Sequence, residues 1–381
     1  MEKLKEAIGR IAPVDPEWVA RAEARHLRLT KPPGSLGRLE RLASRLCAVQ
    51  QTLRPRSDRR RVIIFAADHG VVREGVSAYP PEVTRQMVAN FCAGGAAINA
   101  IARTSQAEIE VVDIGVAGGE GIGGGGAKET LHGARLISAR VRGGTGNIAR
   151  EAAMTEGEML AALCVGVELG EKAAREGVAL VGLGEMGIGN TTAASAVTAA
   201  LTGLAPALVT GRGTGADDRT LARKVAAVEH ALERNRPVGT DALDVLRKVG
   251  GLEIAGLCGL CLGAAGARVA VITDGFIATA GAALAVRLCP AVADYVFAAH
   301  LSTEPGHAAL LELVGLRPLL DLGMRLGEGT GAALAMNVIG AAVAAFNEMA
   351  TFDSAGVSGK SAEGNSEASA VASLADAPDV V

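Results

Sequence analysis

Three glycine-rich segments hold the residue types best suited to bind an anion or to move a proton. The first, residues 182–192, reads Gly-Leu-Gly-Glu-Met-Gly-Ile-Gly-Asn-Thr-Thr and continues an apolar run. A glycine loop that opens a helix offers free backbone N–H groups and the positive end of the helix dipole, so it suits a phosphate. We expect Asn190 or Thr191 to cap the helix that follows.

The first segment also contains the pattern GxGxxG at Gly182, Gly184 and Gly187, which occurs in dinucleotide-binding proteins. That function also requires an acidic residue about twenty positions further on. The next acids, Asp217 and Asp218, lie beyond that distance in another glycine-rich segment. The Gly-Lys-Ser/Thr of a P-loop is absent. Dinucleotide binding and a purely structural turn stay open as alternatives to a phosphate site.

The second segment, residues 210–218, reads Thr-Gly-Arg-Gly-Thr-Gly-Ala-Asp-Asp and is followed by Arg223 and Lys224. A glycine loop with a basic residue one or two turns into the next helix again fits a phosphate. The alternative is a surface loop without a ligand.

The third segment places Glu328 between Gly327 and Gly329, at the start of a long uncharged run. The N-terminus of a helix favours the charged form of a carboxyl group, whereas burial favours the neutral form. A glutamate balanced between these effects is suited to act as a general base. The alternative is that Glu328 only caps its helix.

The other nucleophiles and possible metal ligands carry little signal. Cys258 and Cys261 form a CxxC within a small-residue, helix-like segment, and no second CxxC or paired histidine accompanies them. The six histidines lack ligand spacing, and we expect His69 and His300 to be hydrogen-bonding scaffolds. No GxSxG of a serine hydrolase occurs. These residues therefore predict no metal site.

The composition excludes several classes of protein. With 38 Lys and Arg against 41 Asp and Glu, and only 2% aromatic residues, the chain of 381 residues does not resemble a nucleic-acid-binding protein. Residues 187–211 and 329–347 are uncharged, but their Ala, Gly and Thr content favours buried helices over membrane spans. The scattered cysteines and the lack of an apolar signal segment indicate a reduced, cytoplasmic protein.

Six short apolar runs, separated by Ala-rich segments of helical character, must position the three glycine-rich segments. Such alternation predicts an α/β fold: a doubly wound, mostly parallel six-stranded Rossmann-like sheet. The carboxyl ends of parallel strands form the ligand-binding edge of such a sheet. We expect the polar residues at the strand ends to meet there, namely Asp68, His69, Asp113, Glu185, Asp274 and His300. The predicted strands are residues 61–68, 108–116, 134–141, 178–184, 268–274 and 294–300.

The two ends of the chain are also helical in character. We predict a large α/β domain over residues 50–310 and a small helical domain built from residues 1–49 and 311–352. Residues 353–381 are rich in Ser, Gly and Ala without periodicity, which predicts a disordered tail.

Eight short motifs, in this order, resemble those of the nicotinate-nucleotide–dimethylbenzimidazole phosphoribosyltransferases. The resemblance covers roughly residues 29–349. The motifs are Lys31-Pro-Pro-Gly-Ser-Leu-Gly-Arg-Leu-Glu, Ala67-Asp-His-Gly-Val-Val, Gly75-Val-Ser-Ala-Tyr-Pro, Gly144-Thr-Gly-Asn-Ile, Gly184-Glu-Met-Gly-Ile-Gly-Asn-Thr-Thr, Lys248-Val-Gly-Gly, Asp274-Gly-Phe and Arg325-Leu-Gly-Glu-Gly-Thr-Gly-Ala-Ala.

The resemblance implies a reaction in cobalamin biosynthesis. The 5-phosphoribosyl group of nicotinate mononucleotide would move to 5,6-dimethylbenzimidazole, giving α-ribazole 5′-phosphate and nicotinate by a single displacement. Glu328 occupies the position of the family's general base. The resemblance also implies a homodimer with a parallel six-stranded domain and a small helical domain, without a cofactor.

The resemblance further implies which residues bind the substrates. The nucleotide is expected to contact Glu185, Gly187, Asn190, Gly211, Gly213, Lys224, Ser302 and Gly331. The base is expected to contact Tyr79 and Met87, where some members have Ser and Gln. That difference leaves phenol, p-cresol, other benzimidazoles and purines open as acceptors.

Two other classes of function remain as alternatives. A dinucleotide-dependent oxidoreductase would use the GxGxxG segment and retain a nicotinamide cofactor visible by absorbance. A binding module without catalytic activity would hold the mononucleotide and turn nothing over, which gives the glycine-flanked Glu328 no role.

Overall fold

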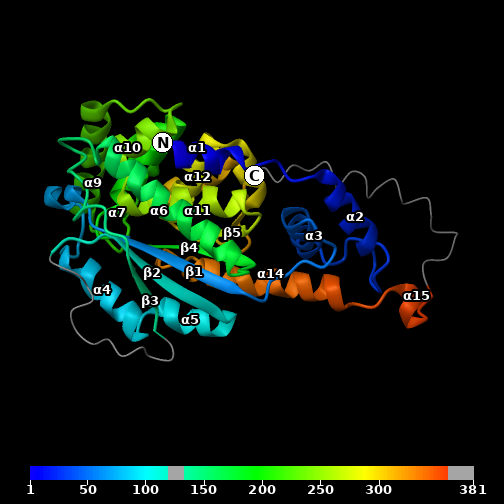
Figure 1. Ribbon diagram of the computed structural model, residues 1–381. Coiled ribbons are helices and arrows are strands. Elements are labelled where there is room, and N and C mark those ends of the chain that lie inside the picture. Colours follow the sequence, from blue (N-terminus) through cyan, green and yellow to red (C-terminus); the bar gives the residue numbers. More distant parts are fainter. Residues whose placement is uncertain (119–132, 359–381) are drawn as a thin grey trace.

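The computed structural model describes residues 1–118 and 133–358, and a single parallel sheet lies at its centre (Figure 1). The sheet has six strands in the order β3-β2-β1-β4-β5-β6, and every strand pair is parallel. The predicted doubly wound α/β fold is confirmed. The strands are β1 (Arg60–Ala67), β2 (Ala107–Gly115), β3 (Arg135–Ser138), β4 (Leu180–Met186), β5 (Ala270–Thr273) and β6 (Val296–Ala298).

Each strand overlaps the apolar run that predicts it, because both faces of the central strands are covered by helices. Every residue of β1 after Arg60 is buried, and all of β5 and β6 is buried. Continuous Val, Ile and Leu runs are typical of parallel strands that lack a solvent face. Only the edge strand β3 is partly exposed along its length.

Helices cover both faces of the sheet, as Figure 1 shows. On one face α11 contacts β1, β2, β4 and β5, while on the other α14 contacts β1, β4 and β5 and α5 contacts β2. The helices up to α8 are α1 (Glu2–Gly9), α2 (Pro16–His26), α3 (Arg38–Gln50), η1 (Gly70–Glu74), α4 (Glu82–Ala93), α5 (Ala97–Ser105), α6 (Glu156–Arg175), α7 (Asn190–Thr202) and α8 (Pro206–Val209). Those that follow are α9 (Asp218–Asn235), α10 (Ala242–Val249), α11 (Leu252–Gly266), α12 (Phe276–Leu288), η2 (Pro290–Tyr295), α13 (Pro305–Val314), α14 (Thr330–Glu348) and α15 (Phe352–Ala355).

Segments from both ends of the chain lie beside the C-terminal part of α14. The N–H of Thr30 donates to the carbonyl of Ala350 at 3.0 Å, and the N–H of Phe352 donates to the carbonyl of Arg28 at 3.0 Å. Helix α3 also packs on α14, whereas α1 packs on α6 and α11, which cover the sheet. The division into a large and a small domain stays a prediction.

The predicted disordered tail begins too early. Residues 352–355 form α15, because the Thr351 side chain accepts a hydrogen bond from the N–H of Ser354 and so caps a short turn of helix. Residues 359–381 of the predicted tail lie outside the described residues.

The two uncharged stretches form helices of the core. Helix α7 is buried along most of its length. Among the described helices, α14 is the one long and apolar enough to cross a membrane by length and composition, and 56% of its most apolar window is buried inside the protein. Its packing against β1, β4 and β5 identifies it as a helix that covers the sheet.

Candidate active site

A cavity of about 540 Å³ opens at the carboxyl ends of β4, β5 and β6. This is the edge at which parallel α/β sheets bind their ligands. The turn before α14 and the loop before α9 complete its wall. Eight of the residues that the family resemblance implies line the cavity, namely Tyr79, Met87, Glu185, Gly187, Asn190, Gly213, Ser302 and Glu328.

The other three expected residues do not line this cavity. Lys224 lines a smaller cavity of about 40 Å³, which shares Gly187 and Asn190 with the main one. At Gly211 a Cβ atom would lie 2.2 Å from Glu304 Oε2, so this glycine allows the Glu304 carboxylate to approach. At Gly331 a Cβ atom would lie 2.1 Å from the His300 ring. Close packing therefore accounts for both glycines.

Glu328 sits on a turn that directs its carboxylate toward α5. Its φ is 64°, and Gly327 and Gly329 on either side have φ of 89° and 83°. Glu328 does not cap its own helix: Gly329 is the N-cap of α14, while Glu328 Oε2 accepts a hydrogen bond of 3.2 Å from Ile98 N–H in the first turn of α5. Burial raises the pKa of Glu328, the bond from Ile98 lowers it, and the charge of Asp274 raises it, with a net rise.

Glu185 is a second buried carboxyl group in the cavity, at the end of β4. The Asn190 amide donates to Glu185 Oε2. The predicted capping by Asn190 or Thr191 is therefore wrong: Gly189 is the N-cap of α7, without a side-chain cap, and the Asn190 side chain bonds Glu185. Burial raises the pKa of Glu185 to about 8, and nearby carboxylates contribute to the rise.

Lys224 lies in the second turn of α9. It is the basic residue that follows the second glycine-rich segment, at the spacing expected for a phosphate ligand. Its Nζ donates to Thr191 Oγ1 at 2.9 Å. Burial lowers the pKa of Lys224 to about 8, against the opposing charge of Glu304. The two glycine-rich segments therefore meet at one place, as a shared phosphate site requires.

Sequence reasoning misses two residues of the site, Glu304 and Arg325. Glu304 Oε1 accepts a hydrogen bond of 2.8 Å from Gly213 N–H, and Arg325 lines the cavity beside Glu328. Asp274 and His300 are predicted at this edge of the sheet, but the sequence assigns neither a binding role. The signal that could have found Arg325 is its position three residues before Glu328 in the same motif. Glu304 has no such signal, since it lies beyond the end of β6, at the start of α13.

One side of the cavity is apolar and suits a flat aromatic ring. Val83 and Met87 of α4 line it together with Ile188 and Phe276. Tyr79 stands at the rim and is 48% exposed. An apolar wall with a few polar groups opposite is typical of small-molecule sites.

The remaining candidates belong to the core. Cys258 and Cys261 are buried in α11, and burial raises the pKa of both thiols. His69 Nε2 lies 2.8 Å from Glu253 Oε1, with both side chains buried. Within the described parts of the chain, no three His, Cys, Asp or Glu side chains are grouped so that they could hold a metal ion.

Comparisons with known proteins agree with this arrangement. A family model described as phosphoribosyltransferase matches residues 11–357. Two relatives named nicotinate-nucleotide–dimethylbenzimidazole phosphoribosyltransferase, from Geobacter sp. (strain M21) and Geobacter sulfurreducens, are 51% and 53% identical over 357 residues, which is 94% of this chain and 99% of each relative. The crystal structure of CobT from Thermus thermophilus matches with a TM-score of 0.84 and 49% identity, covering 91% of this chain and 100% of that chain. The chain therefore belongs to the nicotinate-nucleotide–dimethylbenzimidazole phosphoribosyltransferase family.

Proposed function

We propose that this protein transfers the 5-phosphoribosyl group of nicotinate mononucleotide to 5,6-dimethylbenzimidazole, giving α-ribazole 5′-phosphate and nicotinate. One ring nitrogen of the benzimidazole attacks C1′ of the ribose. The bond from C1′ to the pyridinium nitrogen breaks, and its electron pair stays with nicotinate. The other ring nitrogen of the benzimidazole loses its proton. A single displacement inverts C1′, which turns a β-nucleotide into an α-riboside.

The observation that carries this proposal is the placement of the Glu328 carboxylate in the cavity with its basicity raised by burial. Glu328 accepts the proton that the benzimidazole loses. The leaving nitrogen is a pyridinium nitrogen, so its departure needs no acid. One base is therefore sufficient, and the apolar side of the cavity holds the aromatic acceptor.

The nucleotide lies over the two glycine segments. Lys224 and the backbone N–H groups of the loop before α7 bind the phosphate, with the dipole of α7 in support. Glu304 Oε2 is buried and without a hydrogen-bond partner among the described residues, so it suits a ribose hydroxyl. Glu185, Asn190 and Ser302 line the space between phosphate and base.

Product analysis tests the proposal. Purified protein is incubated with nicotinate mononucleotide and 5,6-dimethylbenzimidazole, and the products are identified by chromatography and mass. We expect α-ribazole 5′-phosphate from the unmodified protein, and a loss of kcat on the order of 10²- to 10⁴-fold in Glu328→Gln, because a general base contributes about that much. Glu312→Gln, on the exposed face of α13, is the matched control and retains activity.

The other outcomes are informative. One is that product forms with phenol, p-cresol, adenine or another benzimidazole and not with 5,6-dimethylbenzimidazole. That outcome would change the proposed acceptor and leave the transferase activity standing. Binding of the nucleotide without turnover of any acceptor would leave a binding module. A copurified nicotinamide cofactor with hydride transfer would favour an oxidoreductase.

We infer from the family resemblance that the protein is a homodimer and acts in the cytoplasm. Light scattering on the purified chain measures the first, and fractionation of the source cells measures the second.

A further inference from the structure

Asp274 follows β5 directly, and its carboxylate binds the start of another element. Oδ2 accepts a hydrogen bond of 2.9 Å from the N–H of Gly329, and Oδ1 accepts one of 2.7 Å from the N–H of Gly331. The Asp274 side chain therefore occupies the N-terminus of α14, where a negative charge is stabilised by the helix dipole. Gly331 allows this approach, since a Cβ atom there would lie 2.7 Å from Asp274 Oδ1.

The turn that Asp274 holds is the one that carries Glu328. Three consecutive residues, from Gly327 to Gly329, have left-handed φ, and Glu328 is the one with a side chain. Such a conformation persists only where its surroundings hold it. Asp274 holds the backbone directly after Glu328, and Ile98 N–H holds the carboxylate itself.

His300 completes the arrangement. Its Nε2 lies 3.4 Å from Asp274 Oδ1, and its ring also packs against the place where a Cβ atom of Gly331 would lie. Asp274 and His300 are both buried. The Asp274 carboxylate is thus fixed by two backbone N–H groups and one imidazole.

We propose that Asp274, held by His300, is a positioning residue that fixes the turn presenting Glu328 to the cavity and sets the electrostatic field at its carboxylate. The inference rests on the proposed function, because it assigns Asp274 an effect on the base of that reaction. Asp274 acts through Glu328 and does not line the cavity itself.

The charged groups around Glu328 determine the sign of the effect. Its carboxylate faces the charge of Asp274 and the N-terminus of α5, Glu185 of β4 interacts with it, and Arg325 belongs to its own segment. Asp274 contributes to the raised pKa of Glu328, after burial. Removal of the Asp274 charge should therefore lower the pKa of Glu328. Removal of a positive charge beside Asp274, such as that of protonated His300, should raise the pKa of Glu328.

The first experiment compares the pH dependence of kcat/KM in the unmodified protein and in Asp274→Asn. The asparagine has nearly the same shape, but it loses the charge and one of the two acceptor atoms. We expect the acidic limb to move to lower pH, and kcat to fall about 10- to 100-fold because a misplaced catalytic group has an effect of that size. KM for nicotinate mononucleotide changes less than about 3-fold, since the phosphate and ribose contacts are intact. Both proteins share the titration of the substrates, so a difference in the limb belongs to the protein.

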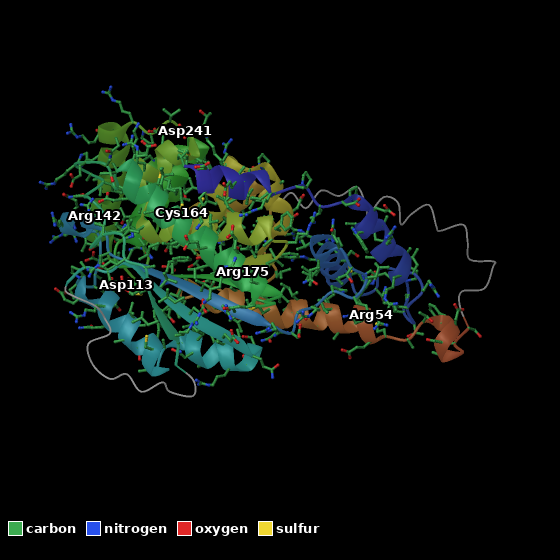
Figure 2. The ribbon with its side chains drawn as sticks, viewed as in Figure 1. Arg54, Asp113, Arg142, Cys164, Arg175 and Asp241 are labelled. Atoms are coloured by element: carbon green, nitrogen blue, oxygen red, sulfur yellow. The ribbon has the colours of Figure 1, made fainter. Side chains whose placement is uncertain are left out.

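Asp241→Asn is the matched control. Asp241 is also a carboxylate that caps a helix, because Oδ1 accepts hydrogen bonds of 3.0 Å from the N–H groups of Leu243 and Asp244. It lies beside α10, at the outer edge of the helical layer in Figure 2. We expect Asp241→Asn to leave kcat and the acidic limb unchanged, so loss of a helix cap by itself does not reproduce the effect.

A second variant, His300→Gln, tests the proposal even if Asp274→Asn does not fold. Although burial lowers the pKa of His300, its hydrogen bond to Asp274 and the charge of Asp274 produce a net rise, which favours the positively charged form of His300. His300→Gln removes this positive charge and should move the limb to higher pH, opposite to Asp274→Asn. A general loosening of the site would not move the acidic limb in opposite directions in the two variants.

A double-mutant cycle completes the test. If Asp274 acts through Glu328, adding Asp274→Asn to Glu328→Gln causes little further loss of kcat. Full additivity, or an acidic limb that neither Asp274→Asn nor His300→Gln moves, would overturn the inference while leaving the transferase activity established. Absence of product from the unmodified protein would instead overturn the proposed function.

Discussion

Glu185 and Lys224 contact the first two residues of α7, Asn190 and Thr191, and burial brings the pKa of each group to about 8. At neutral pH the carboxyl group is therefore mainly protonated and the ammonium mainly charged. The loop before α7 is then electropositive, which favours a phosphate. Titratable groups with strongly shifted pKa values in a cleft are typical of functional sites.

This pair predicts an alkaline limb in the activity. As the pH rises through about 8, Lys224 loses its positive charge and Glu185 gains a negative one, so both changes weaken phosphate binding. We expect kcat/KM for nicotinate mononucleotide to fall above that pH. Lys224→Arg should move the limb to higher pH, because a guanidinium stays charged. A limb that is unchanged in Lys224→Arg but lost in Glu185→Gln would assign the titration to Glu185.

Arg325 predicts the selectivity between nicotinate and nicotinamide nucleotides. Among the described residues that line the cavity, it is the one Lys or Arg side chain, and the nicotinate ring carries a carboxylate. A hydrogen bond between charged groups contributes about 1.5–3 kcal/mol, or roughly 10- to 150-fold in kcat/KM. We expect Arg325→Gln to lose that factor with nicotinate mononucleotide and to lose little with nicotinamide mononucleotide. Equal losses with both substrates would contradict a carboxylate contact.

At single residues, the sequence predicts chemistry better than it predicts contacts. Glu328 between two glycines already suggests a base on an unusual turn, and Lys224 behind the second glycine segment suggests a phosphate ligand. Asp274 could not be assigned in this way, because the N–H groups that it binds are 55 and 57 positions away in the chain. The local sequence favours Asn190 as a helix cap, but its tertiary contact with Glu185 takes precedence over that local preference.

Among the elements, the pair α6 and α11 depends on glycine. Gly166 and Gly170 of α6 face Gly256, Gly259 and Gly263 of α11, so that the two backbones approach closely. A Cβ atom on Gly166 would lie 2.0 Å from the carbonyl oxygen of Gly256. The high glycine content of the sequence thus has one cause in helix packing, apart from the loops of the site.

Gly166→Ala is therefore expected to destabilise the protein by about 1–3 kcal/mol, the usual effect of overpacking a tight contact. Gly157→Ala is the control in the same helix, since a Cβ atom there has no neighbour within 4 Å and the backbone of Gly157 is not left-handed. This control should be neutral or stabilising by up to about 1 kcal/mol. Denaturant unfolding of both variants measures the difference, and equal stability of the two would contradict the packing argument.

The existence and type of the elements follow from the sequence, while their arrangement does not. The apolar runs around Val62 and Val111 predict buried strands, because their apolar residues, mostly Val and Ile, favour burial over contact with water. The pairing of β1 with both β2 and β4 depends on contacts across more than forty residues, and no local pattern encodes it. The sequence does not predict the ends of strands for the same reason. Strand β4 continues to Met186 because it pairs with β1 up to Ala66.

For the whole molecule, α14 runs from the cavity to the place where the segment after α2 meets the segment before α15. Its first turn follows Glu328, and its last turn lies beside α2, where Arg25 donates to the carbonyl of Phe346 from Nε at 3.1 Å and from Nη2 at 3.0 Å. The residues that line the cavity come from positions between Tyr79 and Glu328 in the sequence. We therefore expect the position of the base to depend on packing at a site remote from the chemistry.

Truncation of the C-terminal segment tests whether packing at the last turn of α14 affects Glu328 before its first turn. A chain that ends at residue 358 retains the bonds of Thr30 to Ala350 and of Phe352 to Arg28, and the family match ends at residue 357. We expect it to keep the kcat and Tm of the full chain. A chain that ends at Met349 loses both backbone hydrogen bonds, each contributing about 0.5–1.5 kcal/mol. Its Tm should fall by roughly 2–6 °C, and its kcat should fall more than its KM rises, since α14 positions Glu328 while the nucleotide contacts stay. A loss of activity already on removal of residues 359–381 would show that the end of the chain contributes to the site directly.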